Sequence, residues 1–169
     1  FNNFKNLENF IKLNKIDIVI IGPEKPLVDG IVDYLEKKKI KVFGPNTLAS
    51  KLEGSKIFTK KICEKYKIPT AKYGIFKNAE QSEKFLENCN YPIVVKADGL
   101  ASGKGVYICE DKINALKAVN EIFKGKFGKT NEVLIEEFLD GEEMSFFIIS
   151  DGKTFKPVSY THLTLPTRS

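Results

Sequence analysis

The stretch YPIVVKADGLASGKGV, residues 91–106, decides the fold of the larger part of this chain. An apolar, β-branched run ends in Lys96, a glycine-rich loop follows, and a second apolar run comes after it. The pattern predicts strands over 92–96 and 105–110, which flank the loop 97–104. Further strands are predicted over 72–76, 132–137 and 143–149, with helices opened by Asn78 and Asp111 between them. Strands that pair directly, with helices between the hairpins, indicate an α+β domain.

The first fifty-odd residues follow a different pattern. The apolar run at 16–21 ends at Gly22-Pro23 and is typical of a buried parallel strand. A single helix is predicted from Pro26 to the lysines at 37–39, and a short strand at 42–43 follows. Strand, helix and strand in this order indicate the remainder of a doubly wound α/β unit. Two helices come next, from about Asn46 to Glu53 and from the predicted N-cap Ser55.

Composition and charge argue against several classes of protein. With 42% hydrophobic residues, the 169-residue chain can bury a core, which argues against disorder. Its apolar runs are shorter than the ~18 residues of a membrane span, and its first residues lack the pattern of a signal peptide. Three separated cysteines and a single histidine, His162, argue against a disulfide framework, a zinc site and a Ser-His-Asp triad. The net charge of +5 suits an anionic partner, but charge alone favours the simpler explanation, a lysine-rich solvated surface.

The glycine-rich loop is the first candidate site. Gly99, Gly103 and Gly105 allow the backbone to approach phosphate oxygens, and Lys104 adds a positive charge. The loop differs from a Walker A motif in its spacing and in lacking Ser or Thr after the lysine. Lys96 ends an apolar strand, where a buried ammonium needs an anion such as a polyphosphate. A flexible hairpin connection and an ordinary salt bridge are the alternatives, and these residues alone leave both open.

Two further segments are candidates for binding. The acidic segment EEFLDGEE, residues 136–143, would suit ribose recognition, but acidic turns between strands are common. Gly22-Pro23-Glu24 lies at the carboxyl end of a predicted parallel strand, where open α/β sheets bind ligands. The alternative for this second segment is a simple strand-to-helix turn.

Four segments, taken in order, resemble the phosphoribosylamine–glycine ligases, or glycinamide ribonucleotide synthetases, of the ATP-grasp superfamily. They are IVIIGPEKPLVDGIVDYL, FGPNTLASKLEGSKIFTK, YPIVVKADGLASGKGV and VLIEEFLDGEEMSFFIISDGK. Together they cover most of residues 15–157 in the family's order and spacing. Other ATP-grasp ligases share a lysine strand and a glycine-rich loop, whereas KADGLASGKG followed by EEFLDGEE is specifically similar to this family.

The resemblance implies ATP-driven amide formation. The glycine carboxylate would attack the γ-phosphoryl group of ATP, and the amine of 5-phosphoribosylamine would displace phosphate from the resulting acyl phosphate. Lys56 and Lys96 are the implied catalytic residues, which would hold ATP phosphates while the loop from Asp98 to Gly105 closes as a lid. The implied ATP-binding residues are Lys56, Lys96, Asp98, Gly99, Ser102, Gly103, Lys104, Gly105, Glu136, Glu137, Phe138, Leu139 and Glu143. Backbone groups of 136–139 would meet adenine and Glu143 the ribose, whereas Gly22, Pro23 and Glu24 would face phosphoribosylamine.

The same resemblance divides the chain. Residues 1–54 are expected to end a Rossmann-like N-terminal domain, and 55–158 to begin an ATP-grasp domain with its small α+β lobe. Residues 159–169 depart from the family and are interpreted as a foreign tail. Mg²⁺ or Mn²⁺ is implied for the enzyme, with its ligands expected outside this chain. We expect these residues alone to be inactive, because the nucleotide of this superfamily lies between two lobes, one of which is largely missing.

The expected partners are ATP, glycine and 5-phosphoribosylamine, without nucleic acid or membrane, and the expected location is the cytoplasm. Two alternatives stay open: another ATP-grasp ligase with a different acceptor, and a non-catalytic nucleotide- or anion-binding module. Dispersed lysines, with no row of aromatic residues beside them, argue against a nucleic-acid module.

Overall fold

The computed structural model describes residues 4–101, 104–128 and 130–163. Two compact units make up the chain, Phe1–Phe138 and Leu139–Ser169, and each is described by itself. Within the described residues, no helix has the length and apolar character needed to cross a bilayer.

The first unit begins with a small α/β layer. Its elements are α1 (Phe4–Leu13), β1 (Val19–Ile20), α2 (Glu24–Val28), α3 (Ile31–Lys37), β2 (Val42–Phe43) and α4 (Thr47–Gly54). Strands β1 and β2 pair in parallel, which confirms the predicted parallel arrangement. Apolar side chains of α1 and α3 bury one another in a core of Ile11, Ile31, Val32 and Leu35. The amphipathic faces of these two helices therefore hold this layer together.

Two expectations for this layer are wrong. The run at 16–21 is not buried: Ile18 and Ile20 are 55% and 71% exposed. Their sheet has only two strands in the described chain, and so one side of these residues meets solvent. The single helix predicted from Pro26 is two helices, because Gly30 adopts a left-handed conformation (φ +90°) between α2 and α3. Glycine takes this conformation at no steric cost, and it ends the first helix.

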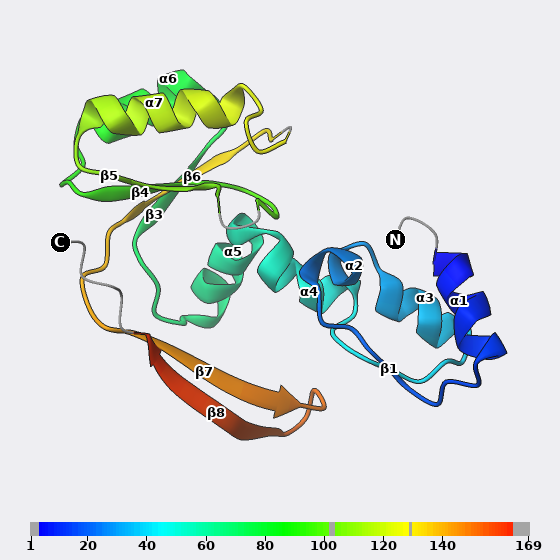
Figure 1. The fold of residues 1–169 in the computed structure, drawn as a ribbon. Coiled ribbons are helices and arrows are strands. Elements are labelled where there is room, and N and C mark those ends of the chain that lie inside the picture. Colours follow the sequence, from blue (N-terminus) through cyan, green and yellow to red (C-terminus); the bar gives the residue numbers. More distant parts are fainter. Residues whose placement is uncertain (1–3, 102–103, 129, 164–169) are drawn as a thin grey trace. The chain divides into compact units, whose positions relative to one another are not determined.

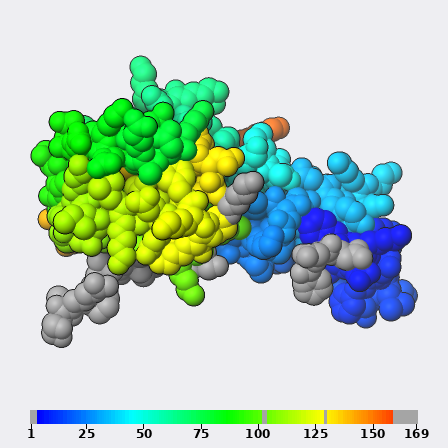
Figure 2. Space-filling view, turned by 90° about the horizontal axis from the view of Figure 1, so that it is seen from above, coloured from blue at the N-terminus to red at the C-terminus, as the bar shows by residue number. Residues whose placement is uncertain are grey.

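A four-stranded antiparallel sheet forms the rest of the first unit. Its strands are β3 (Tyr73–Phe76), β4 (Ile93–Ala97), β5 (Val106–Cys109) and β6 (Val133–Glu137), in the order β3-β6-β4-β5. Helices α6 (Ala79–Leu86) and α7 (Lys112–Phe123) cover one face of this sheet (Figure 1). Seen from that side, the atoms of these helices form a continuous layer, green to yellow-green in Figure 2. This sheet with two helices on one face confirms the predicted α+β arrangement.

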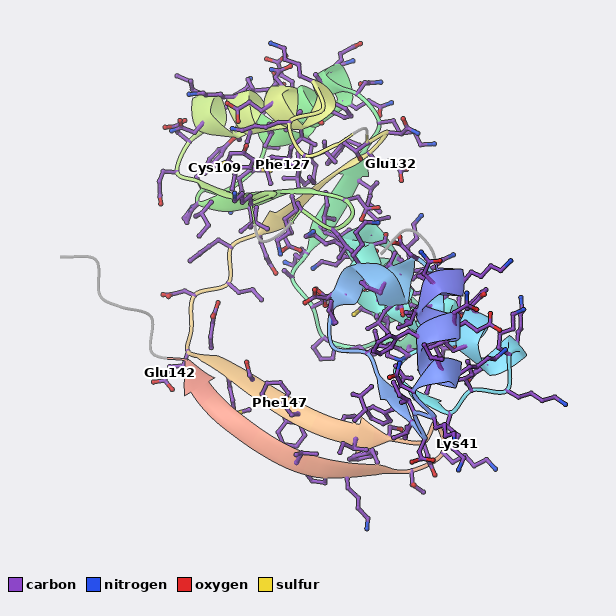
Figure 3. All side chains as sticks on the ribbon, turned by 45° about the vertical axis from the view of Figure 1, so that its right-hand side comes forward. Lys41, Cys109, Phe127, Glu132, Glu142 and Phe147 are labelled. Atoms are coloured by element: carbon purple, nitrogen blue, oxygen red, sulfur yellow. The ribbon has the colours of Figure 1, made fainter. Side chains whose placement is uncertain are left out.

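Side chains of the sheet alternate between its two faces. The core between sheet and helices contains Ile93, Val95, Ala97, Cys109, Val133 and Ile135 from the strands. Cys109 and Phe127, labelled in Figure 3, both contribute to this core. Because successive residues of a strand point to opposite faces, Lys96 and Glu136 lie on the face away from α6 and α7. The hydrophobic pattern thus decides which side of the sheet carries the polar groups.

Helix ends in this unit follow the sequence signals. Asn46, Ser55, Asn78 and Asp111 are the N-caps of α4, α5 (Lys56–Tyr66), α6 and α7, and each side chain accepts a backbone N–H three residues on. Not every apolar residue of the last helix is buried, since Ile113 is 79% exposed. The buried residues of α7 are Ala115, Ala118, Val119 and Ile122. With 3.6 residues per turn, Ile113 lies on the side of α7 opposite Ile122, which explains its exposure.

The second unit is an antiparallel hairpin of β7 (Glu143–Ser150) and β8 (Phe155–Leu163). Asp151 and Gly152 lie in its turn, and a bulge lies between Phe147 and Ile148. Many apolar side chains of β7 are more than half exposed, including Phe147, which Figure 3 labels. Strand β8 continues into the segment 159–169, whose interpretation as a foreign tail stays a prediction.

Candidate functional site

The glycine-rich loop leaves β4 and returns as β5 in a defined geometry. Ala97 N donates to Gly105 O at 2.8 Å, and Lys104 N donates to Ala101 O at 2.9 Å. Gly99 has φ +94°, and a Cβ at Gly105 would lie 2.7 Å from the Ala101 Cβ. A side chain at Gly99 would strain the backbone, and a side chain at Gly105 would clash with Ala101. Both glycines are therefore required by the backbone of the loop itself.

The base of this loop is tied to the beginning of α5. The Asp98 carboxylate accepts the Ser55 hydroxyl at 3.0 Å and the Ile57 backbone N–H at 3.1 Å. Lys56 Nζ donates to Gly99 O at 2.9 Å. A carboxylate at a helix N-terminus is stabilised by the unpaired N–H groups and the helix dipole. The Asp98 carboxylate is thus hydrogen-bonded to the beginning of α5. Sequence reasoning had placed this residue among the ATP contacts.

Lys56 is a half-buried cation beside a second one. Burial lowers the pKa of its ammonium, and the positive charge of Lys96 lowers it further, whereas Asp98 and Glu53 act in the opposite direction. The positive charge of Lys96 thus acts on Lys56, and an anion beside Lys56 would stabilise the charge of its ammonium.

Lys96 belongs to a three-membered ion cluster. Its ammonium contacts Glu136 Oε1, and Lys60 Nζ lies 2.6 Å from Glu136 Oε2. The side chains of Glu136 and Lys60 are 6% and 10% exposed, whereas that of Lys96 is 26% exposed. Lys60 also donates to Thr70 Oγ1 at 2.8 Å and to Ala71 O at 3.0 Å. Two ammonium groups thus share one buried carboxylate, and Lys96 is the member that meets solvent.

A cleft of about 410 Å³ lies beside the loop. It is lined by Glu24, Lys25, Glu53, Lys56, Gly99, Leu100, Ala101, Gly105 and Val106. Glu24, predicted to face a substrate, thus shares a cleft with Lys56 and two glycines of the loop. Gly22 and Pro23, predicted beside it, precede α2 and are not among the lining residues.

The other predicted site residues are dispersed. Glu137 Oε1 accepts the Lys72 backbone N–H at 2.9 Å at the end of β6, and the next residue, Phe138, is exposed. Lys104 is exposed, whereas Ser102 and Gly103 lie outside the described residues. Leu139 and Glu143 belong to the second unit. The structure therefore brings together Lys56, the loop and Glu24 around one cleft, and Lys96 with Glu136 in one cluster.

Sequence reasoning missed Lys60 and the side-chain role of Glu136. Lys60 follows Lys56 by one helical turn, so that both lie on one face of α5. The spacing of one turn from Lys56 was the available signal, but the partner of Lys60, Glu136, is remote in sequence. Among the described residues, no group of three or more His, Cys, Asp or Glu side chains is placed to hold a metal ion.

Comparison with known proteins gives family matches over nearly the whole chain. The family model described as phosphoribosylglycinamide synthetase, N domain, matches residues 1–53, and that of the ATP-grasp (A) domain matches residues 54–162. A phosphoribosylamine–glycine ligase of Brucella melitensis is 51% identical over 150 residues, which are 88% of this chain and 35% of the relative. One of Clostridium acetobutylicum is 49% identical over 158 residues, 90% of this chain and 37% of the relative. The chain thus spans about a third of the length of these relatives.

Solved structures agree with this result. The phosphoribosylamine–glycine ligase of Thermotoga maritima matches with a TM-score of 0.72 and 33% identity, over 88% of this chain and 37% of that one. A biotin carboxylase–β,γ-ATP complex of Campylobacter jejuni matches with a TM-score of 0.79 and 20% identity, over 95% of this chain and 37% of that one, a likeness of fold alone. These likenesses confirm the predicted fold class, a Rossmann-like remainder followed by an incomplete ATP-grasp domain. The chain belongs to the phosphoribosylglycinamide synthetase family.

Proposed function

We propose that this chain is part of a ligase that joins glycine to 5-phosphoribosylamine with ATP, forming glycinamide ribonucleotide, ADP and phosphate. Support comes from family membership and from relatives that carry the name phosphoribosylamine–glycine ligase. The observation that carries the proposal is the cleft beside the glycine-rich loop, where the ammonium of Lys56 donates to Gly99 O and lines the same space as Gly99 and Gly105. The polyphosphate of ATP, which is a substrate here, fits this cleft because it would neutralise the charge of Lys56 and lie against the loop backbone.

Lys56 and Lys96 would act by positioning and by neutralising charge. Phosphoryl transfer needs little covalent help from the protein, and fixed cations stabilise the charge on the transferring oxygens. Lys56 uses one N–H on Gly99 O, so that its ammonium is held at the base of the loop while the others can reach a phosphate. The loop backbone would close over the phosphates and keep water from the glycyl phosphate formed from glycine.

The acceptor would approach from the Glu24 side of the cleft. Glu24 comes from α2, whereas Lys56 and Gly99 come from α5 and the loop, and all three line the same cleft. A carboxylate there can accept hydrogen bonds from the amine or the hydroxyl groups of phosphoribosylamine. Gly22 and Pro23 would set the backbone that presents Glu24. Glycine would then react between the acceptor and the phosphates.

The adenosine contacts remain proposals from the resemblance. Backbone groups of Glu136, Glu137, Phe138 and Leu139 would bind adenine, and Glu143 would bind the ribose. Mg²⁺ or Mn²⁺ would neutralise phosphate charge in the enzyme, but the described residues offer no cluster of three or more His, Cys, Asp or Glu side chains that fits a metal ion. We also propose that the enzyme works in the cytoplasm on small molecules. The 169 residues alone would not catalyse the ligation.

A chimeric enzyme tests this proposal. Residues 1–158 of this chain would replace the matching segment of the Brucella melitensis ligase, to which it is 51% identical. We expect ADP to form only when glycine and 5-phosphoribosylamine are both present. Lys96→Ala should lower the rate more than tenfold, as expected for a lost transition-state cation, whereas Lys61→Ala, an exposed lysine on α5, should not. ADP formation that needs no glycine, or equal rates for both variants, would contradict the proposal.

A further inference from the structure

Lys60 has three protein oxygens around its ammonium, whereas Lys56 and Lys96 each contact one among the residues that the structure describes. It donates to Thr70 Oγ1 and Ala71 O, and Glu136 Oε2 lies 2.6 Å away. An ammonium group has three N–H donors. Two of the Lys60 donors are used by Thr70 and Ala71, and the ammonium also pairs with Glu136 on a side chain that is only 10% exposed. Lys60 is a fixed cation that cannot itself bind a phosphate without losing a protein partner.

Lys96 stands at the other oxygen of the same carboxylate. Among the described residues its ammonium contacts Glu136 only, and its side chain is 26% exposed. Two of its three donors are thus available within the described part of the chain. Glu136 Oε1 holds Lys96 while Glu136 Oε2 faces Lys60, so that the carboxylate cannot rotate without breaking one of the two ion pairs.

The charge of this cluster is unbalanced. Two ammonium groups and one carboxylate leave a net charge of +1 in a cluster with two nearly buried members. An uncompensated charge in such a place is costly unless an anion approaches it. Lys96 is the exposed member, and it lies on the side of the sheet away from α6 and α7. Of the three members of this cluster, Lys96 is therefore the one that an anion can best reach from solvent.

From these contacts we propose that Lys60 is a positioning residue for Lys96. Lys60 pairs with one oxygen of the Glu136 carboxylate and Lys96 with the other. Glu136 therefore holds Lys96 in place but neutralises only part of its charge. This leaves Lys96 with charge and free N–H groups for a phosphate of ATP. The inference rests on the proposed function, in which Lys96 meets ATP. Neither the family match nor the sequence pattern assigned this task to Lys60.

Lysine acylation in the ligand-free chain tests the positioning directly. The chain would be treated with a trace of an amine-reactive ester, and the rate at Lys96 would be read by peptide mapping. In Lys60→Met, Glu136 interacts with Lys96 alone, and this undivided ion pair keeps the Lys96 nitrogen from the reagent. We expect the rate at Lys96 to fall at least about threefold, a modest change for a pair freed of a competing charge. Lys60→Arg should restore most of the rate, and Lys61→Met, one residue away and exposed, should leave it unchanged.

Calorimetric titration of Mg-ATP into the same variants supplies the second readout. Lys60→Met should bind Mg-ATP about tenfold more weakly than the wild-type chain, the effect of a lost charge-assisted contact, and Lys61→Met should bind it equally well. An unchanged acylation rate at Lys96 in Lys60→Met overturns the inference, as does a slowed rate with undiminished ATP affinity. If the wild-type chain binds no ATP, the phosphate site fails in this chain, whereas acylation still decides whether Lys60 positions Lys96. Should Lys60→Met not fold, Lys60→Gln replaces it, because its amide can still donate to Thr70 and Ala71 without a charge.

Discussion

Removing the Asp98 carboxylate should loosen both the glycine-rich loop and α5. This side chain accepts the Ser55 hydroxyl and the Ile57 N–H at 3.0–3.1 Å, at a helix N-terminus. Hydrogen bonds to charged groups contribute about 1.5–3 kcal/mol each, and a carboxylate near a helix N-terminus adds about 0.3–1 kcal/mol. The Ile57 bond goes to a single oxygen, the Ser55 hydroxyl is shared between both oxygens, and the side chain is only half-buried. We therefore expect Asp98→Ala to lower the free energy of unfolding by about 2–3 kcal/mol. Asp98→Asn, which keeps an acceptor for Ile57 N–H but loses the charge, should cost about 1 kcal/mol.

Urea unfolding followed by circular dichroism measures this loss. With a slope of about 2 kcal/mol per molar urea, Asp98→Ala should lower the midpoint by about 1–1.5 M. Asp111→Ala is the matched control, because it removes an exposed N-cap of α7 and should cost only about 1 kcal/mol. Hydrogen exchange of the first turn of α5 should rise in the Asp98 variants only. If Asp98→Ala cost no more than Asp111→Ala, the tie between loop and helix would be refuted.

Three further predictions concern single groups. Gly105→Val should destabilise the chain by about 2 kcal/mol or more in urea unfolding, because its side chain would meet Ala101, and an unaffected midpoint would show that the loop has room to spare. Burial raises the pKa of the Cys109 thiol to about 11, so that the folded chain should leave Cys109 unmodified by iodoacetamide at pH 8 and react there only after unfolding; rapid modification of the native thiol would contradict its burial. The pKa of Lys56 in the folded chain is lowered, and a bound anion should raise it, so that Lys56 takes up a proton when Mg-ATP binds at a pH just below the ordinary lysine pKa. Calorimetry of Mg-ATP binding in buffers of different ionisation enthalpy should detect this uptake, and Lys56→Ala should lack it. Identical heats in all buffers would contradict the prediction.

Local signals in the sequence predicted local structure well. The caps at Asn46, Ser55, Asn78 and Asp111 depend on hydrogen bonds within three residues, and the loop glycines on backbone conformation. The break at Gly30 was missed because an apolar face continues across it, and only the left-handed turn reveals two helices. Exposure of Ile18 and Ile20 was missed because a run of β-branched residues carries no information on how many strands join its sheet.

The candidate site likewise contains residues that the sequence could identify and residues that it could not. Lys56, Lys96 and the glycine-rich loop could be selected from short motifs and from a family resemblance. The ion cluster could not, since Lys60 and Glu136 meet only after α5 and β6 are placed by the packing of the whole unit. Asp98 likewise looked like a ligand group in the motif, and its structural task at α5 depends on a partner that is distant in sequence. Side-chain contacts between remote elements are set by tertiary packing, which no periodicity encodes.

Calorimetric titration of Mg-ATP into the chain, with Lys96→Ala beside it, tests the central claim most directly. The account predicts saturable binding by the wild-type chain, at least about tenfold weaker in Lys96→Ala, with Lys61→Ala matching the wild type. Binding of equal strength in all three proteins would contradict the claim that Lys96 and the glycine-rich loop form the phosphate site, and so would the absence of binding to a chain that circular dichroism shows to be folded.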